Sequence, residues 1–166
     1  VIEINFQTLD EIALSYVANN DLNRLADLCK YAQMNRYDLE EVDGYGNTAL
    51  LKACFLARLE AVQMLLNSGA NIKAINYLGQ NALTLATYAG SWLVVMELLH
   101  HRSLRDFNLS SVFPAYCVAV LRQDQKLMQM LWDQDARSCS SAVTSHGNLV
   151  LVRSGPTVGF FLSYFY

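Results

Sequence analysis

The stretch GNTALLKAC, at residues 46–54, is followed by GQNALTLAT at residues 79–87. Their first glycines lie 33 residues apart, and several apolar residues further along the chain keep this offset. The matched pairs are Ala49 and Ala82, Leu50 and Leu83, Ala53 and Ala86, Val62 and Val95, Leu65 and Leu98, and Leu66 and Leu99. Self-similarity at a period of roughly 20–50 residues is typical of arrays of small stacked units. We therefore interpret the chain as a repeat array.

Two weaker copies flank this pair. Downstream, Val112 takes the place of the glycine and Pro114 takes the place of Asn81. The apolar positions of that copy are Ala115, Ala119, Met128 and Leu131. Upstream, residues 13–29 align with residues 50–66 at an offset of 37. We expect the four additional residues to lie in a loop around residues 34–41.

Each unit has the pattern of two short amphipathic helices. In the first full copy, Thr48 is a suitable N-cap for a helix over residues 49–56. Apolar residues spaced three to four apart predict a second helix over residues 59–67. Gly69 follows that helix, in a position where the left-handed conformation favours glycine. Residues 67–81 then predict a turn, a short extended stretch and a second turn at Gly79.

In this register the sequence resembles the ankyrin repeat, whose pattern runs roughly D-x-x-G-x-T-P-L-H-x-A-A before a second helix that ends L-L-x-x-G-A. The first full copy matches it at Asp43, Gly46, Thr48, Leu50, Ala53, Leu65, Leu66, Gly69, Ala70 and Asn71, and the second at Gly79, Leu83, Ala86, Gly90, Leu98 and Leu99. The proline and histidine of the pattern are absent from both copies, which lowers the expected stability. The resemblance implies an all-α ankyrin-repeat solenoid of stacked helix-turn-helix units with short hairpin-like turns.

The repeats divide the chain into five predicted segments. These are an N-terminal helical segment with a degenerate first repeat (1–42), two ankyrin repeats (43–75 and 76–108), a degenerate ankyrin repeat (109–137) and a non-repeat tail (138–166). Residues 138–148 are small and polar, and they predict a loop. The apolar residues beyond it have three interpretations: a strand pair packed on the last repeat, a disordered tail, or the degenerate start of a further repeat. The run is too short for a transmembrane helix, which needs about 17–25 residues.

The composition argues against several classes of partner. The chain has 12 basic and 15 acidic residues and no dense Lys/Arg cluster, so nucleic acid and anionic membranes are not expected as partners. None of its four cysteines belongs to a CxxC pair. We therefore expect a reduced, cytoplasmic setting, with the nucleus as the alternative compartment.

The sequence contains no motif that predicts catalysis. A phosphate-binding loop, a nucleophile elbow and the common metal motifs are absent. His100 and His101 are adjacent, which suits the end of a helix better than a metal pair. Cys139 and His146 lack a third group that would orient them for nucleophilic catalysis. We predict no enzymatic activity, no cofactor, no metal and no small-molecule ligand.

Partners of ankyrin repeats usually meet the turn tips and the exposed side of the first helix, so the resemblance implies a non-catalytic protein-protein interaction module, an adaptor or scaffold. The candidate protein-binding residues are Tyr45, Asn47, Phe55, Leu56, Tyr77, Leu78, Gln80, Tyr88, Phe113 and Arg122, with Ile75, Ser110 and Leu121 at neighbouring register positions. For Phe55 and Leu56, packing inside the array is an equal alternative. The alternative function is regulatory: the array would pack on a catalytic or membrane domain of a larger parent protein, such as a kinase or a channel.

Overall fold

The computed structural model describes residues 12–34, 37–112 and 114–142, with side chains described as far as Asp135. Within these ranges the chain forms helices and no strand, as predicted. The helices are α1 (Ile12–Asn19), α2 (Leu22–Gln33), α3 (Ala49–Phe55), α4 (Leu59–Asn67), α5 (Ala82–Ala89), α6 (Trp92–His101), α7 (Leu104–Ser110), α8 (Ala115–Leu121) and α9 (Gln125–Ala142). The chain divides into a compact unit of residues 1–135 and a second unit of residues 136–166.

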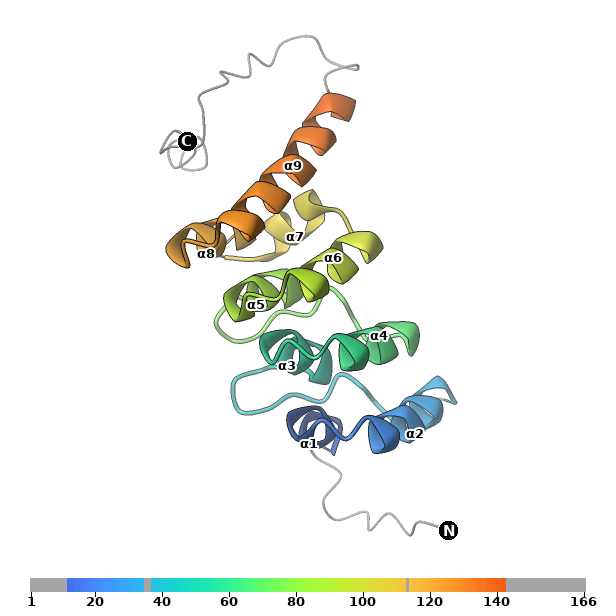
Figure 1. Cartoon of the computed structure of the whole chain (residues 1–166). Coiled ribbons are helices and arrows are strands. Elements are labelled where there is room, and N and C mark those ends of the chain that lie inside the picture. Colours follow the sequence, from blue (N-terminus) through green and yellow to red (C-terminus); the bar gives the residue numbers. More distant parts are fainter. Residues whose placement is uncertain (1–11, 35–36, 113, 143–166) are drawn as a thin grey trace. The chain divides into compact units, whose positions relative to one another are not determined.

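The first unit is a stack of helix pairs. Helix α1 packs on α2, α3 on α4, and α5 on α6, and the first helices of successive pairs also pack on one another, from α1 through α3 and α5 to α8 (Figure 1). The second helices α2, α4 and α6 form a parallel row of contacts. The rings of Tyr116 on α8 and Trp132 on α9 lie 6.3 Å apart between centroids. This arrangement confirms the predicted all-α solenoid.

A continuous apolar seam runs between the pairs. Leu50, Leu65, Leu83 and Leu98, one from each helix of the two full repeats, are no more than 1% exposed and belong to one core cluster. Complete burial of one such side chain contributes about 1.5–3 kcal/mol to the free energy of unfolding. Ala53 and Ala86 are fully buried on the first helices, where their small side chains let neighbouring helices approach closely. The seam therefore depends on each pair having a neighbour.

The tight turn inside each pair has the same geometry in all four repeats. One residue there has a positive φ: Asn20 (57°), Ala57 (56°), Gly90 (75°) and Gln123 (57°). These positions are separated by 37, 33 and 33 residues, which are the offsets that the sequence predicted. The same turn geometry therefore recurs at the spacing of the aligned segments. Two of the four positions, Ala57 and Gln123, hold a residue that is strained in this conformation, whereas glycine and asparagine tolerate it.

Local predictions around the first full repeat are also confirmed. Thr48 caps α3 by accepting a hydrogen bond from the amide of Leu51 at 3.3 Å, and α4 spans the predicted residues. Gly69 has a φ of 90°, as expected for a glycine that ends a helix. The predicted loop over residues 138–148 is wrong at its start, because α9 continues to Ala142. Residues 143–166 lie outside the described residues, and so do the three interpretations of the tail.

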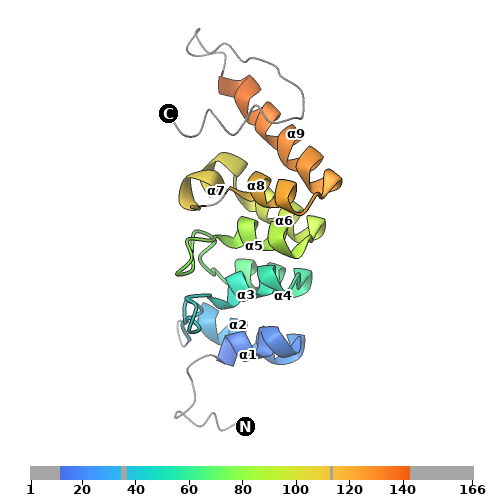
Figure 2. The ribbon, with the colours of Figure 1, turned by 90° about the vertical axis from the view of Figure 1, so that its left-hand side faces the viewer.

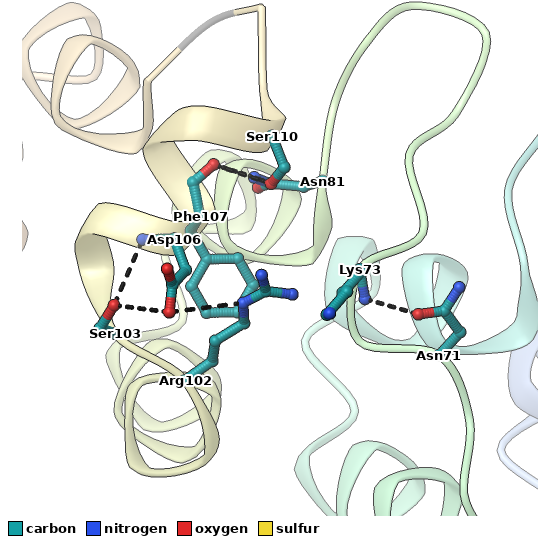
Figure 3. Close-up of polar contacts among 8 residues, drawn as sticks. All are labelled: Asn71, Lys73, Asn81, Arg102, Ser103, Asp106, Phe107 and Ser110. Atoms are coloured by element: carbon teal, nitrogen blue, oxygen red, sulfur yellow. Dashed lines mark hydrogen bonds and ion pairs between the residues drawn. The ribbon is translucent and has the colours of Figure 1, made fainter.

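The loop after α6 contains helix α7, which the sequence did not lead us to expect. Ser103 begins it: the hydroxyl accepts from the amide of Asp106 at 3.3 Å and donates to the carboxylate of the same residue at 2.8 Å (Figure 3). Phe107 anchors the helix in the core and is 1% exposed. A Ser-x-x-Asp spacing before an apolar residue is a helix-start signal. That signal was present in the sequence at residues 103–106.

Asn81 joins α7 to the preceding repeat. Its Oδ1 accepts from the amide of Thr84 at 2.9 Å, which caps α5. Its Nδ2 donates to the carbonyl of Phe107 at 2.7 Å and to the hydroxyl of Ser110 at 3.1 Å (Figure 3). Thr48, one repeat earlier, caps α3 in the same way but has no amide to donate. The asparagine therefore adds a connection that a threonine at this register cannot make.

Replacing Ala57 by glycine is expected to stabilise the protein. An alanine with a positive φ destabilises the folded state by about 1–2 kcal/mol, and glycine removes this strain. Glycine also has a larger conformational entropy in the unfolded state, which offsets about 0.5–1 kcal/mol of that stabilisation. Ala57→Gly should therefore raise the urea midpoint. Gly90→Ala should lower it, because a Cβ there would lie 2.6 Å from Nη2 of Arg122. Equal midpoints for the two variants would contradict the assigned turn geometry.

Replacing Asn81 by threonine tests the connection to α7. The hydroxyl retains the cap of α5, while both amide hydrogen bonds are lost and the carbonyl of Phe107 is left without this donor. We expect a loss of about 1–3 kcal/mol in unfolding free energy. Hydrogen exchange should become faster in α7 and stay unchanged in α3. Unaltered exchange in α7 would show that the connection contributes nothing.

Candidate functional site

Two loops of the array are held in shape by the same pattern of hydrogen bonds to a side-chain oxygen. Oδ1 of Asp43 accepts from the amides of Tyr45 and Asn47, both at 2.9 Å. One repeat later, Oδ1 of Asn76 accepts from the amides of Leu78 and Gln80 at 3.1 and 2.9 Å. These bonds fix the backbone of each turn from within. The residues at the turn tips are therefore positioned without having to bury their own side chains.

Neighbouring loops are also bonded to each other. The amide of Tyr77 donates to the carbonyl of Tyr45 at 3.0 Å, and the amide of Val112 donates to the carbonyl of Gly79 at 3.0 Å. Nδ2 of Asn76 reaches back to Oδ1 of Asn47 at 3.0 Å. These contacts connect the successive loops along one edge of the stack (Figure 2).

This edge exposes a row of apolar side chains, which we call the loop edge. Its members range from 51% to 80% exposed: Tyr45, Ile75, Tyr77, Leu78, Leu109 and Val112. Large apolar residues on a fixed backbone are the usual anchors of protein interfaces, because they bring contact area at a low cost in conformational entropy. The loop edge thus has the character of a preformed recognition surface.

The first helices add a second row, which we call the inner column. The rings of Phe55 on α3 and Tyr88 on α5 are stacked at 5.9 Å between centroids, with planes 12° apart. Leu121, at the same register on α8, is 71% exposed. Nη1 of Arg122 donates to the carbonyl of Tyr88 at 2.5 Å, at the C-terminal end of α5 where a cation is favourable. Phe55 and Tyr88 therefore pack on each other and remain about half exposed.

The structure separates the sequence-predicted residues into two groups. Tyr45, Phe55, Tyr77, Leu78, Tyr88 and Arg122, together with Ile75 and Leu121, are exposed. Asn47 and Gln80 are half-buried and bonded to Asn76, and Leu56 is half-buried against the core. Ser110 donates to the carbonyl of Phe107 within α7. Phe113 lies outside the described residues.

Sequence reasoning missed several exposed apolar residues. Leu109 and Val112 join the loop edge because α7 occupies the third loop. Trp92, Leu93 and Met96 lie on one side of α6, are 41–46% exposed, and are called the outer patch here. The ammonium of Lys126 lies 3.9 Å from the ring centroid of Trp92. The spacing of Trp92 and Met96, four residues apart, was the available signal for an exposed apolar face.

The described side chains show no arrangement suited to catalysis. Burial raises the pKa of the Cys54 thiol, and also that of Cys29, so both thiolates are disfavoured. Nε2 of His101 lies 3.3 Å from Oε1 of Glu97 at the end of α6. No three His, Cys, Asp or Glu side chains in the described part of the chain are grouped as metal ligands. Among the helices of the described residues, none has the length and apolarity needed to cross a membrane.

Stacked helix pairs joined by bonded loops define a solenoid repeat protein. A family model described as ankyrin repeats in three copies matches residues 12–111. The chain therefore belongs to the ankyrin-repeat family, whose members are protein-interaction modules and generally non-catalytic.

Two known proteins are similar to this chain. DNA replication inhibitor plutonium of Drosophila melanogaster is 52% identical over 136 residues, which cover 81% of this chain and 78% of that protein. Transient receptor potential cation channel subfamily A member 1 of Homo sapiens is 32% identical over 105 residues, which cover 62% of this chain and 9% of that protein. The second similarity thus concerns a small part of a much longer protein.

The Asp43 carboxylate makes the stability of the turn at residues 43–47 sensitive to pH. Its burial would raise the pKa, but hydrogen bonds from Asn47 and Tyr45 outweigh this, and the net pKa is below the ordinary value of 3.8. A lowered folded-state pKa stabilises the fold above the unfolded-state value, and this contribution is lost as the pH falls through the folded-state pKa. The urea midpoint should therefore depend less on pH below about 4 in Asp43→Asn. Asn76 shows that an amide can hold the same turn. Parallel pH profiles for the two proteins would exclude this role.

Proposed function

We propose that this chain is a non-catalytic protein-binding module, an adaptor or scaffold, that engages its partner through the loop edge and the inner column. The observation that carries the proposal is the exposure of Tyr45, Tyr77 and Leu78, at 69–73%, on turns whose backbone is already fixed. A fixed surface loses little conformational entropy when a partner binds. Removal of these apolar side chains from water contributes favourably to the free energy of binding.

The relative from Drosophila melanogaster supports a more specific assignment. Because that protein is named a DNA replication inhibitor and matches most of this chain, we propose that the partner is a protein that acts in the control of DNA replication. The proposed compartment is the cytoplasm, with the nucleus as the alternative. The mechanism is passive: a rigid array presents apolar side chains to the partner, and no covalent step or cofactor takes part.

A second candidate function is regulatory, with the array packing on a catalytic or membrane domain of a larger parent protein. The outer patch favours it, because Trp92, Leu93 and Met96 expose an apolar face on the opposite helix layer from the inner column. A domain packed there would cover these residues and leave the loop edge open. The two candidates therefore predict different surfaces for the partner.

Substituting Tyr45, Tyr77 and Tyr88 together by alanine tests the first candidate. The intact chain is used as bait, and the captured proteins are quantified by mass spectrometry. Capture of the principal partner should fall at least tenfold, which corresponds to about 1.4 kcal/mol of binding free energy. The far-UV circular dichroism should stay helical, since the three side chains are more than half exposed.

The matched control carries alanine at Trp92, Leu93 and Met96. It removes a similar apolar area from the other helix layer and should leave capture unchanged. Loss of capture in this control, with the tyrosine variant still binding, would replace the first candidate by the regulatory one. Unchanged capture in both variants would remove both.

A further inference from the structure

The loop edge has an acidic end. Residues 37–48 contain four carboxylates and no basic residue. They are Asp38, Glu40, Glu41 and Asp43, of which Asp38 is exposed and the others are half-buried. Oε1 of Glu40 accepts from the amide of Asn71 at 2.7 Å, so this group is held against the next repeat. The residues of the first loop therefore sum to −4 at one end of the row of exposed apolar side chains. The Asp43 carboxylate is paired with the ammonium of Lys52 on α3 at 3.8 Å, so Asp38, Glu40 and Glu41 give this end its acidic character.

The next two loops have the opposite sign. Residues 68–81 contain Lys73 as their one charged residue, and residues 102–112 contain Arg102, Arg105 and Asp106, so each loop carries +1. Lys73 and Arg105 are exposed. The charge along the edge thus changes from −4 on the first loop to +2 on the other two together. This polarity follows from the loops and is independent of the apolar seam.

Two cations face each other at the basic end. Figure 3 shows the side chains of Lys73 and Arg102 pointing toward one another from neighbouring segments. Nε of Arg102 lies 3.8 Å from Oδ2 of Asp106, and its guanidinium lies 5.9 Å from the ring centroid of Phe107. Nη1 of the same guanidinium is buried and has no hydrogen-bond partner. A carboxylate bound near both side chains would accept charge-assisted hydrogen bonds from them.

On the basis of the proposed function, we propose that the loop edge binds an extended segment of a partner protein with basic residues at one end, apolar residues in the middle and a carboxylate at the other end. The basic residues face the carboxylates of the first loop, and the carboxylate faces Lys73 and Arg102. The apolar residues contact Tyr45, Tyr77 and Leu78.

The spacing of the repeats sets the length of that segment. Stacked helices lie about 8–10 Å apart, so the two charged ends, one to two repeats apart, are separated by roughly 10–20 Å. An extended chain covers this distance in about three to six residues at ~3.3 Å per residue. The exposed charges orient the segment and exclude segments of the reverse polarity, while the apolar contacts supply most of the affinity.

The test is selection from a phage-displayed library of random 12-residue peptides on the immobilised chain. The enriched peptides should carry a basic end and an acidic end three to six residues apart, with apolar residues between them. Lys73→Glu should remove the preference for the acidic end alone, and Asp38→Lys should weaken the preference for the basic end alone. The control is Lys30→Glu, a reversal on an exposed residue of α2, which should select the same peptides as the unaltered chain.

Affinity measurements with one enriched synthetic peptide complete the test. Each reversal should weaken binding roughly two- to fivefold at low salt, and the difference should shrink at high salt. Enrichment without charge polarity, polarity that ignores the reversals, or no enrichment would overturn the inference. A different contrary result would be sedimentation experiments in which the chain associates with itself and both charge reversals abolish this association. Such a result would overturn the inference and identify a second copy of the chain as the occupant of the loop edge. If the tyrosine variant still loses its captured partner, the proposed function stands even where this inference fails.

Discussion

Each helix pair of this chain has an apolar face that it cannot cover by itself, and the rest of the structure depends on that constraint. Leu50 and Leu65 are buried only because a pair lies on either side of α3 and α4. Stability is then a sum of terms between neighbours. This explains why the same residues recur every 33 positions, whereas the residues between them are free to differ.

The tips of the turns take no part in this burial, although loop residues such as Leu39 and Ala70 belong to the core cluster. Asp43 and Asn76 close the turns with hydrogen bonds to backbone amides, and bonds between successive loops fix them further. A loop held through its polar backbone can leave a tyrosine or a leucine at its tip in water. The exposed fractions of Tyr77 and Leu78, 73% and 69%, are a direct consequence.

The same division explains what could be predicted from the sequence. Thr48, Gly69 and the 33-residue period report local and nearest-neighbour constraints, and the helices they predicted were correct. Helix α7 was missed although its local Ser-x-x-Asp start signal stands at residues 103–106. What only coordinates could show is its connection to the preceding repeat, because the amide of Asn81 reaches 26 residues along the chain to the carbonyl of Phe107. Within the candidate site, the pattern placed the tyrosines correctly at exposed positions. It could not show that Asn47 and Gln80 are engaged with Asn76, since such pairings need coordinates.

Because the seam and the loop edge are separate, membership of the ankyrin-repeat family determines the first and leaves the second open. The human channel that is 32% identical to this chain matches it over 9% of its own length. The leucines and alanines that pack between the helices are the residues that recur with the repeat. In the proposed function, recognition depends instead on exposed loop residues such as Lys73 and Leu109, which do not recur with the repeat. The charge and apolar pattern of the loops is therefore the physical basis on which a partner of this chain has to be sought.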